Sequence, residues 1–278
     1  EPYTDGLPSY PLNTVGTVDI SYPYTIQLAG GVPVIVQASL EQGFKVTPEM
    51  LDAKCTDKTK LLVLNTPSNP TGAVYNAEEL AAILDWADSR DVYVLTDEIY
   101  DQLVFAPAKM ASAVHHFAKN PEKVAILNGV SKSFAMTGWR LGWLAAAAPV
   151  IAEIAKAHQY LVSSAVSFEM DAAARALTVD PTPMLKVYRA RRERVLAALD
   201  AMGLDVVEPA GAFYTFPSIK KFGLTSEDFC IKAIKEANVA LVPGDCFGTE
   251  GHIRLSYCVS GKNLDEGLHR LSTFVSIL

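Results

Sequence analysis

The sequence predicts an α/β fold built on a mostly parallel β-sheet. Three short apolar runs, at residues 61–65, 91–97 and 123–129, alternate with helical or turn-rich stretches in the first half of the chain. Strands separated in this way favour a parallel sheet with helices on both faces. Polar residues just past the ends of such strands converge on a ligand-binding crevice.

Each run has its own supporting signal. LLVLN, at 61–65, has the composition of a buried strand and is followed by the turn-forming sequence TPSNPTG. The next segment, NAEELAAILDWADS, predicts a helix, because Asn76 with Glu79 three residues later matches a capping box. DVYVLTD and KVAILNG then supply the second and third strands.

The second half of the chain has a different pattern of expected helices and strands. One long helix is expected at 183–203, followed by shorter strands in GAFYTFP, VALVPG and HIRLSYC and a closing helix in LDEGLHRLSTFVSIL. We therefore expect a large domain at 21–180 and a small α+β domain at 181–278. Residues 1–20 sustain neither helical nor strand periodicity, and they predict either an arm lying on a partner subunit or a join across missing residues.

Composition excludes several classes of protein. The 278 residues are 50% apolar, enough for a large core, and their net charge of −7 argues against a nucleic-acid groove or an anionic membrane surface. No apolar run has the length of a membrane span, and no signal peptide opens the chain. The four cysteines lack CxxC spacing and predict reduced core residues, and the five histidines form no metal motif. We expect a cytoplasmic protein without a bound metal.

Four polar side chains follow the ends of the three predicted strands: Asn69, Asp97, Tyr100 and Lys132. Arg140 comes eight residues after the lysine. A buried carboxylate or ammonium without a partner costs several kcal/mol, so each of these groups needs a counter-group or a ligand.

Pyridoxal 5′-phosphate satisfies every member of this set. Its aldehyde condenses with an amine such as Lys132 to give a Schiff base. Its ring nitrogen pairs with a carboxylate, the role that Asp97 can fill, and its phenolic oxygen accepts hydrogen bonds from Tyr100 and Asn69. Its phosphate suits the forked guanidinium of Arg140.

Five segments in order carry a family resemblance. SNPTG, TDEIY, NGVSKSFAMTGWRLGW, GAFYTFP and HIRLSYC are similar to the signature segments of fold-type I, class I/II aminotransferases, and they most resemble the bacterial-type aspartate aminotransferase branch. The similarity runs from about Ser21 to the end of the chain. Each string alone is weakly specific, but their order and the lysine-to-arginine spacing are highly specific.

The resemblance implies roles for these residues. Lys132 falls where the family has its Schiff-base lysine, which also carries the proton during catalysis. Asp97 matches the partner of the ring nitrogen, and Tyr100 and Asn69 match the contacts to the phenolic oxygen. Asn69 is also expected at the substrate, beside Arg254, which matches the arginine that binds the substrate α-carboxylate.

The phosphate group is assigned in the same way. Ser131 and Arg140 match the family's phosphate ligands, and Tyr3, in the opening YTDG, resembles a tyrosine that reaches the phosphate of the neighbouring subunit. The family also has a phosphate loop, a helix and a ring-stacking aromatic ahead of SYP, whereas this sequence has Asp19 there. We expect that a stretch near residues 8–20 is missing; the alternative is a truncated protein that binds the cofactor weakly.

The sequence thus predicts a homodimeric aminotransferase that moves an amino group between an L-amino acid and a 2-oxo acid by a ping-pong mechanism. Aspartate or glutamate is the preferred substrate from resemblance. Three alternatives stay open: a lyase that performs β-elimination with the same cofactor, a non-catalytic cofactor-binding relative, and an unrelated α/β enzyme. The absence of the GxGxxG and P-loop strings disfavours a nucleotide-binding enzyme.

Overall fold

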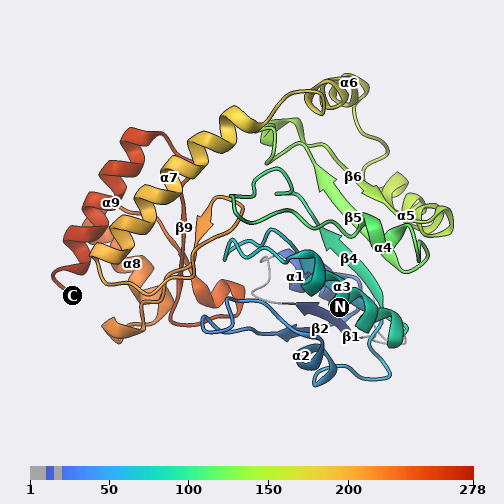
Figure 1. The fold of residues 1–278 in the computed structure, drawn as a ribbon, viewed down its shortest axis with the longest axis horizontal. Helices are drawn as coiled ribbons and strands as arrows, with labels where there is room; N and C mark the ends of the chain where they lie inside the picture. The colour runs from blue at the N-terminus through green and yellow to red at the C-terminus, as the bar shows by residue number, and fades with distance from the viewer. Residues whose placement is uncertain (1–10, 16–20) are drawn as a thin grey trace.

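The computed structural model describes residues 11–15 and 21–278, with the side chains of 21–278. A six-stranded sheet in the order β2-β1-β3-β4-β5-β6 forms the first half (Figure 1). Its strands are β1 (Pro11–Val15), β2 (Val32–Val36), β3 (Leu61–Asn65), β4 (Tyr93–Asp97), β5 (Val124–Gly129) and β6 (Gly142–Ala145). Strands β1 to β5 run parallel, and β6 is antiparallel to β5.

The register of the central strands brings three carboxyl ends together. Asn65, the last residue of β3, pairs with Asp97, the last residue of β4, and Asp97 pairs in turn with Leu127 near the end of β5. The loops that follow these strands therefore start at one edge of the sheet. The predicted site residues that follow β3, β4 and β5 share this edge.

Six helices accompany this sheet: α1 (Ser21–Leu28), α2 (Pro48–Asp52), α3 (Ala77–Ser89), α4 (Val114–Phe117), α5 (Ala148–Leu161) and α6 (Ser167–Ala176). Helix α3 buries Leu80, Ile83 and Leu84 in a core shared with β3, β4 and β5. Its predicted capping box is confirmed, with both reciprocal hydrogen bonds between Asn76 and Glu79 present.

The other face of the sheet is less completely covered than the sequence predicted. Helix α5 has no buried residue. An apolar cavity of about 440 Å³ lies beside it, lined by residues such as Leu61, Leu95, Leu127 and Ile154. Within the described part of the chain, the expected helical cover on both faces is therefore present on one face and partial on the other.

A second, three-stranded sheet in the order β7-β9-β8 lies in the C-terminal half. It consists of β7 (Tyr214–Thr215), β8 (Val242–Pro243) and β9 (Ile253–Ser256), with helices α7 (Thr182–Ala201), α8 (Ser226–Ala237) and α9 (Gly261–Val275) gathered beside it (Figure 1). The predicted long helix, the short strands and the closing helix are all present.

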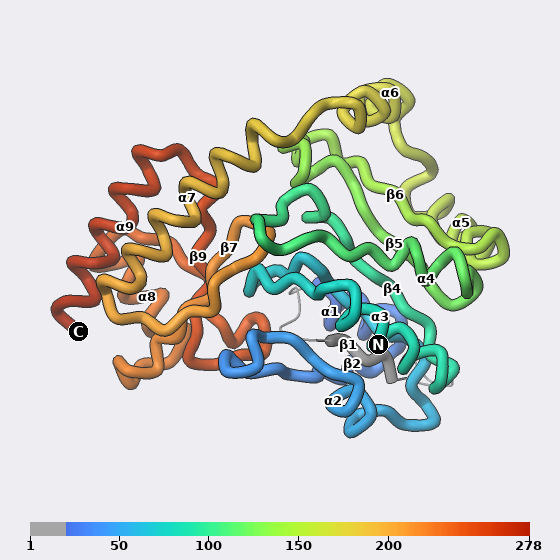
Figure 2. Tube along the Cα trace, in the orientation of Figure 1, coloured from blue at the N-terminus to red at the C-terminus, as the bar shows by residue number. Residues whose placement is uncertain are grey.

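The two halves are joined by a segment of the first that enters the core of the second. Tyr100, Leu103 and Phe105 belong to the same buried cluster as residues of α7, α8, β9 and α9. Val104 forms an isolated antiparallel bridge with Gly211, and the two segments run side by side in Figure 2. The division near residue 181 stays a prediction, although α7 begins at Thr182.

Strand β1 was not predicted. Residues 11–15 read PLNTV, and a proline and an asparagine in five residues give little strand signal. Its pairing with β2 on one side and β3 on the other supplies the context that local sequence lacks. The expectations for Tyr3 and Asp19 lie outside the described residues.

No helix of the described chain is both long enough and apolar enough to cross a membrane.

The capping box gives a direct test of the fold around the site. Replacing Asn76 by alanine is expected to lower the free energy of unfolding by about 1 kcal/mol, because backbone N–H groups of α3 lose their acceptor. Asn76→Asp keeps a good cap and should stay near wild type. Urea denaturation of the three proteins measures the difference, and equal midpoints for all three would contradict the role of the cap.

Candidate active site

Asp97 ends β4 with its side chain already engaged. Its Oδ1 accepts a hydrogen bond from the backbone N–H of Ile99 at 3.1 Å, and its Oδ2 accepts one from the hydroxyl of Tyr22 at 2.5 Å. The side-chain amide of Asn65 donates a hydrogen bond to the backbone carbonyl of Asp97 at 3.1 Å. Asp97 is 9% exposed, so a nearly buried carboxylate is fixed at the carboxyl edge of the sheet.

Asn69 links this edge to the C-terminal half. Its backbone N–H donates to Oδ1 of Asn65 at 2.8 Å, which ties the loop after β3 to the strand end. Its own Oδ1 accepts a hydrogen bond from Nη1 of Arg254 at 2.8 Å. The amide therefore connects the strand ends of the first sheet to β9 of the second.

The guanidinium of Arg254 packs against two aromatic rings. Its guanidinium carbon lies 4.6 Å from the ring centre of Tyr214 and 5.0 Å from that of Phe247. Side chains alternate along β9: Ile253 and Leu255 are buried on one face, and Arg254 points to the other. Its Nε is buried without a hydrogen-bond partner, and the side chain forms no ion pair with any described residue.

Tyr100, which follows Asp97 by three residues in the sequence, is buried. Its hydroxyl oxygen lies 3.0 Å from the hydroxyl oxygen of Tyr214, a hydrogen-bond distance. Its ring packs edge-on against Phe213 and Tyr214, with centroids 5.4 and 5.9 Å apart. Tyr100 and Arg254 therefore contact the same neighbour, Tyr214.

Lys132 lies in the loop after β5. The next residue, Ser133, is buried and donates to Oδ1 of Asp101 at 2.9 Å and, less closely, to the carbonyl of Ile99 at 3.4 Å. These contacts fasten the lysine loop to the turn that follows Asp97. Lys132 is half-buried, and within the described residues its ammonium forms no ion pair or hydrogen bond.

The predicted phosphate ligands, Ser131 and Arg140, are more exposed than Asp97 and Tyr100. Ser131 is half-buried beside Lys132, but Arg140 is exposed, and its Nη1 donates to the carbonyl of Thr137 at 3.1 Å. The loop that carries Arg140 returns to β5, where Val130 N–H donates to the Leu141 carbonyl at 3.3 Å. Arg140 thus lies on the loop between β5 and β6 that also carries Lys132, and its phosphate contact stays a prediction.

The family model described as "Aminotransferase class I and II" matches residues 20–271, almost the whole chain. The chain belongs to the class I and II aminotransferases.

Relatives and solved structures agree with this assignment. The chain is 43% identical over 265 residues to a Bacillus subtilis protein named "Probable N-acetyl-LL-diaminopimelate aminotransferase", covering 94% of this chain and 66% of the relative. It is 40% identical to an aspartate aminotransferase of Pyrococcus abyssi, covering 91% and 66%. The aromatic aminotransferase of Pyrococcus horikoshii superposes with a TM-score of 0.93 at 37% identity, covering 99% of this chain and 75% of that one.

The chain spans about two thirds of the length of these curated relatives. The three proteins are named for different substrate classes: an N-acetylated diamino acid, aspartate and aromatic amino acids. Similarity alone therefore fixes the family and the fold-type I architecture, and it leaves the substrate open.

Class I and II aminotransferases use pyridoxal 5′-phosphate, and the residues present fit that group chemically. The edge of the sheet offers a fixed carboxylate at Asp97, a buried phenol at Tyr100, an amide at Asn69 and, at Lys132, an amine without an ion-pair partner among the described residues. A guanidinium with a buried, unpartnered Nε stands beside them in Arg254. Together these side chains offer one anionic group, two basic groups and two neutral hydrogen-bonding groups.

Glu98 is a second carboxylate directly after Asp97 in the sequence. Its Oε1 accepts hydrogen bonds from the backbone N–H of Ala113 at 2.8 Å and from the hydroxyl of Thr96 at 3.3 Å. Burial raises the pKa of Glu98, and the charge of nearby Asp101 adds to this effect. Glu98 therefore supports the start of α4, which leaves Asp97 as the candidate at the strand end.

Sequence reasoning missed three contributors to the site: Tyr22, Tyr214 and Phe247. Tyr22 lies in the SYP segment, but only its contact with Asp97 reveals a role. Tyr214 lies within the recognised GAFYTFP string, and its position on a strand paired with β9 was the available signal. Phe247 ends a 3₁₀ helix, Gly244–Phe247, which has no local sequence signature.

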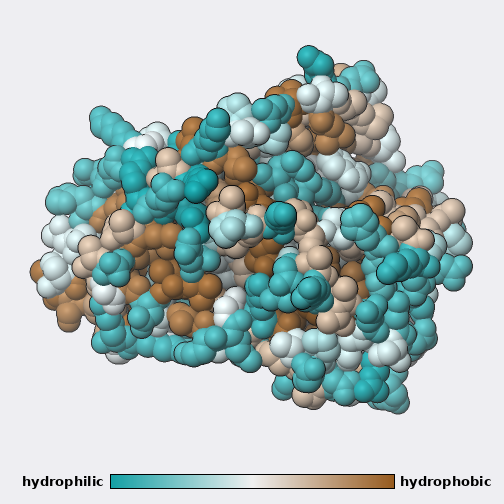
Figure 3. Space-filling view, in the orientation of Figure 1, coloured by the Kyte–Doolittle hydropathy of each residue, from teal (hydrophilic) through white to brown (hydrophobic). Residues whose placement is uncertain are grey.

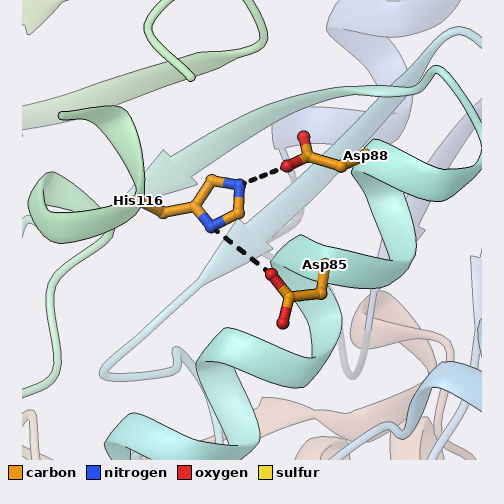
Figure 4. A group of neighbouring side chains, drawn as sticks. All are labelled: Asp85, Asp88 and His116. Atoms are coloured by element: carbon orange, nitrogen blue, oxygen red, sulfur yellow. Dashed lines mark hydrogen bonds and ion pairs between the residues drawn. The ribbon is translucent and has the colours of Figure 1, made fainter. Parts of the chain in front are cut away.

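One group of described residues has metal-ligand chemistry, and it lies elsewhere. Asp85 and Asp88 on α3 flank the ring of His116 on α4 (Figure 4). His116 Nε2 lies 2.8 Å from Asp88 and Nδ1 lies 3.9 Å from Asp85, and Asn120 donates to Asp88 at 2.9 Å. These groups pair with one another and tie α3 to α4. The side chain of His116 is only 10% exposed.

The cysteine prediction is partly wrong. All four cysteines are free thiols, as expected, but Cys246 and Cys258 are exposed, and only Cys230 is fully buried. Burial raises the pKa of Cys230 to about 12, so this thiol stays protonated at neutral pH.

Glu98 provides a pH test. Its pKa is raised in the folded protein, so its contribution favours folding below its ordinary value near 4.5 and is lost as the pH rises through the raised value. Glu98→Gln keeps an acceptor for Ala113 without the charge. We expect the stability of the variant relative to wild type to increase from pH 4 upwards in urea denaturation, with Glu122→Gln, an exposed glutamate, as the control. A difference that is constant with pH would contradict the raised pKa.

Proposed function

We propose that this chain is a pyridoxal-phosphate-dependent aminotransferase that moves an amino group between an L-amino acid and a 2-oxo acid. The preferred pair is aspartate or glutamate with 2-oxoglutarate, in two half-reactions of a ping-pong cycle. A homodimer and a cytoplasmic location belong to the same proposal.

One observation carries the proposal: the guanidinium of Arg254 is enclosed by Tyr214 and Phe247 and has no carboxylate partner among the described residues. Leaving a largely buried charge uncompensated costs several kcal/mol. A ligand carboxylate would supply the missing anion, and the flat, forked guanidinium favours a bidentate contact. Every amino acid and every 2-oxo acid brings such a carboxylate.

The other residues divide the remaining work. Lys132 would hold the cofactor through its amine and carry a proton at Nζ, for which its half-buried position, without an ion pair to residues that the structure describes, is suited. Asp97 would place a fixed negative charge against the cofactor's ring nitrogen. The bound cofactor supplies an electron sink that stabilises the carbanion formed at the substrate α-carbon.

Orientation follows from the hydrogen bonds that already connect the strand ends. Asn69 would contact the phenolic oxygen of the cofactor while its Oδ1 holds Nη1 of Arg254. Tyr100 would contact the same phenolic oxygen. Ser131 and Arg140 would bind the phosphate. With Arg254 fixing the carboxylate, the α-carbon is held within reach of Lys132.

The first experiment removes the amine. Lys132→Ala should abolish the visible absorbance change that wild type gives when glutamate is added, and lower amino transfer by about 10²–10⁴-fold, because the proton carrier is lost. Absorbance and the keto acid product are measured with a panel of amino acids. Lys123→Ala, a lysine paired with Asp91 at the opposite edge of the sheet, is the matched control.

The outcomes separate the alternatives. Release of pyruvate and ammonia without a keto-acid acceptor would favour a β-elimination lyase. Cofactor binding without conversion by any amino acid would favour a non-catalytic relative. A Lys132→Ala protein that turns over at the wild-type rate would refute the role of the lysine.

The homodimer has support on the surface. Tyr160 and Leu161 at the end of α5 are 89% and 81% exposed, and Phe168 on α6 is 65% exposed beside Trp139. Figure 3 shows apolar side chains along the upper edge of the molecule, where α6 lies. Exposed apolar groups of this size typify protein–protein interfaces.

Light scattering of the eluting protein tests the homodimer. We expect a mass of twice 30.0 kDa for wild type. Phe168→Asp should shift the equilibrium towards the single chain by placing a charge at the interface, whereas Ile277→Asp, similarly exposed near the C-terminus, should not. A single-chain mass for wild type at every concentration would exclude the dimer.

A further inference from the structure

Tyr214 contacts two groups that have separate roles in the proposed function. Its hydroxyl oxygen lies 3.0 Å from that of Tyr100, the expected neighbour of the cofactor's phenolic oxygen. Its ring lies 4.6 Å from the guanidinium carbon of Arg254, the expected ligand of the substrate carboxylate. Tyr214 is 7% exposed, so both contacts are made by a buried side chain.

The backbone explains how one side chain reaches both. Tyr214 on β7 pairs antiparallel with Ser256 on β9, and Arg254 lies two residues before Ser256 on the same face of that strand. Diagonal neighbours on one face of a sheet are within reach of aromatic and long side chains. The ring of Phe247 packs on Arg254 as well, so the guanidinium has an aromatic neighbour from two elements.

The hydroxyl contact with Tyr100 has two possible directions, because either oxygen can be the donor. Each phenol has one proton. If Tyr100 donated to Tyr214, its proton would be used there. If Tyr214 donates, the proton of Tyr100 is available to an acceptor in the site, and the bond polarises Tyr100 into a stronger donor.

We propose that Tyr214 is a positioning residue that donates its hydroxyl proton to Tyr100 while its ring holds the guanidinium of Arg254. One side chain thereby sets the donor strength at the cofactor and the orientation of the arginine at the substrate carboxylate. This inference rests on the proposed function. It goes beyond that function by assigning a shared support to two contacts that the family resemblance treats separately.

The two halves of the inference can be removed one at a time. Tyr214→Phe keeps the ring over Arg254 and removes only the hydroxyl. Tyr214→Leu removes the ring as well. Tyr188→Phe is the matched control, because Tyr188 stacks on Phe213, with centroids 5.5 Å apart, and loses a hydroxyl in the same core.

Two readouts are taken on the protein loaded with pyridoxal phosphate. The first is the pH midpoint of the bound cofactor's visible absorbance. The second is the dissociation constant, by calorimetry, for maleate and 3-phenylpropionate, which carry carboxylates and lack an amino group. The calorimetry is repeated on the cofactor-free protein, so that carboxylate binding is measured independently of the cofactor.

For Tyr214→Phe we expect the absorbance midpoint to rise by about half a pH unit, because a weaker donor at Tyr100 stabilises the ionised phenolic oxygen less. Its carboxylate affinity should stay within about twofold of wild type. Tyr214→Leu should raise the midpoint similarly and weaken carboxylate binding by about three- to tenfold, the range expected for a lost cation–π contact. Tyr188→Phe should change neither readout.

Each other outcome has a defined meaning. A midpoint that falls in Tyr214→Phe shows that Tyr100 is the donor, and an unchanged midpoint shows that the contact is without consequence; both overturn the inference. So does a loss of carboxylate affinity in Tyr214→Phe as large as in Tyr214→Leu. If Tyr214→Leu fails to fold, Tyr214→Phe still decides the hydroxyl, and Phe247→Leu decides the packing of the guanidinium by the same calorimetry.

Failure of the proposed function is recognised separately. A wild type that takes up no cofactor, or one whose absorbance is unaffected by Lys132→Ala, refutes the aminotransferase proposal and with it the role of Tyr214 at the cofactor. A wild type that binds cofactor and transfers amino groups, alongside a Tyr214→Phe protein with an unshifted midpoint, refutes the present inference alone.

Discussion

The parallel register of β3, β4 and β5 is the constraint on which the site depends. Because Asn65, Asp97 and Leu127 are aligned across neighbouring strands, the segments that follow them leave the sheet at one edge. Residues more than sixty positions apart in sequence, such as Asn69 and Lys132, are brought to that edge by strand pairing. Short polar contacts then fasten the departing loops to one another, as Ser133 does with Asp101.

The second half of the chain completes the site by reaching across to this edge. Arg254 projects from β9, and its hydrogen bond to Asn69 spans 185 positions of sequence. In return, Tyr100 and the residues after it enter the core of the C-terminal half. These contacts fix the distance between Arg254 and the polar groups at the strand ends, and any motion of one half relative to the other must alter both sets of contacts.

Much of this arrangement was predictable from sequence, and the reasons differ by element. The apolar runs at β3, β4 and β5 indicate buried strands directly, because strands covered on both faces need continuous apolar residues. The start of helix α3 was predictable from the capping box formed by Asn76 and Glu79. The family resemblance then singled out the polar residues at the strand ends, whose roles at a cofactor stay a prediction.

What sequence could not give depends on long-range pairing. Strand β1 has five residues without strand character and exists because two neighbours flank it. Tyr22, Tyr214 and Phe247 look like ordinary aromatic residues until their partners are known. The exposure of Cys246 and the contact between the His116 ring and Asp88 likewise follow from which surfaces meet, a property that no local window of sequence contains.

The fates of two adjacent carboxylates show how the fold converts a generic acidic pair into distinct functions. Successive side chains at a strand end point to opposite sides. Glu98 thus turns to the start of α4, where a backbone N–H and a hydroxyl satisfy it. Asp97 turns to the side of Tyr22 and is held by the backbone of Ile99. The same alternation on β9 sends Arg254 towards Asn69 while its neighbours fill the core. Strand geometry and these hydrogen bonds thereby fix an anion at Asp97 and a cation at Arg254, a polarity that suits the proposed pairing of a cofactor with a protonated ring nitrogen and a substrate with a carboxylate.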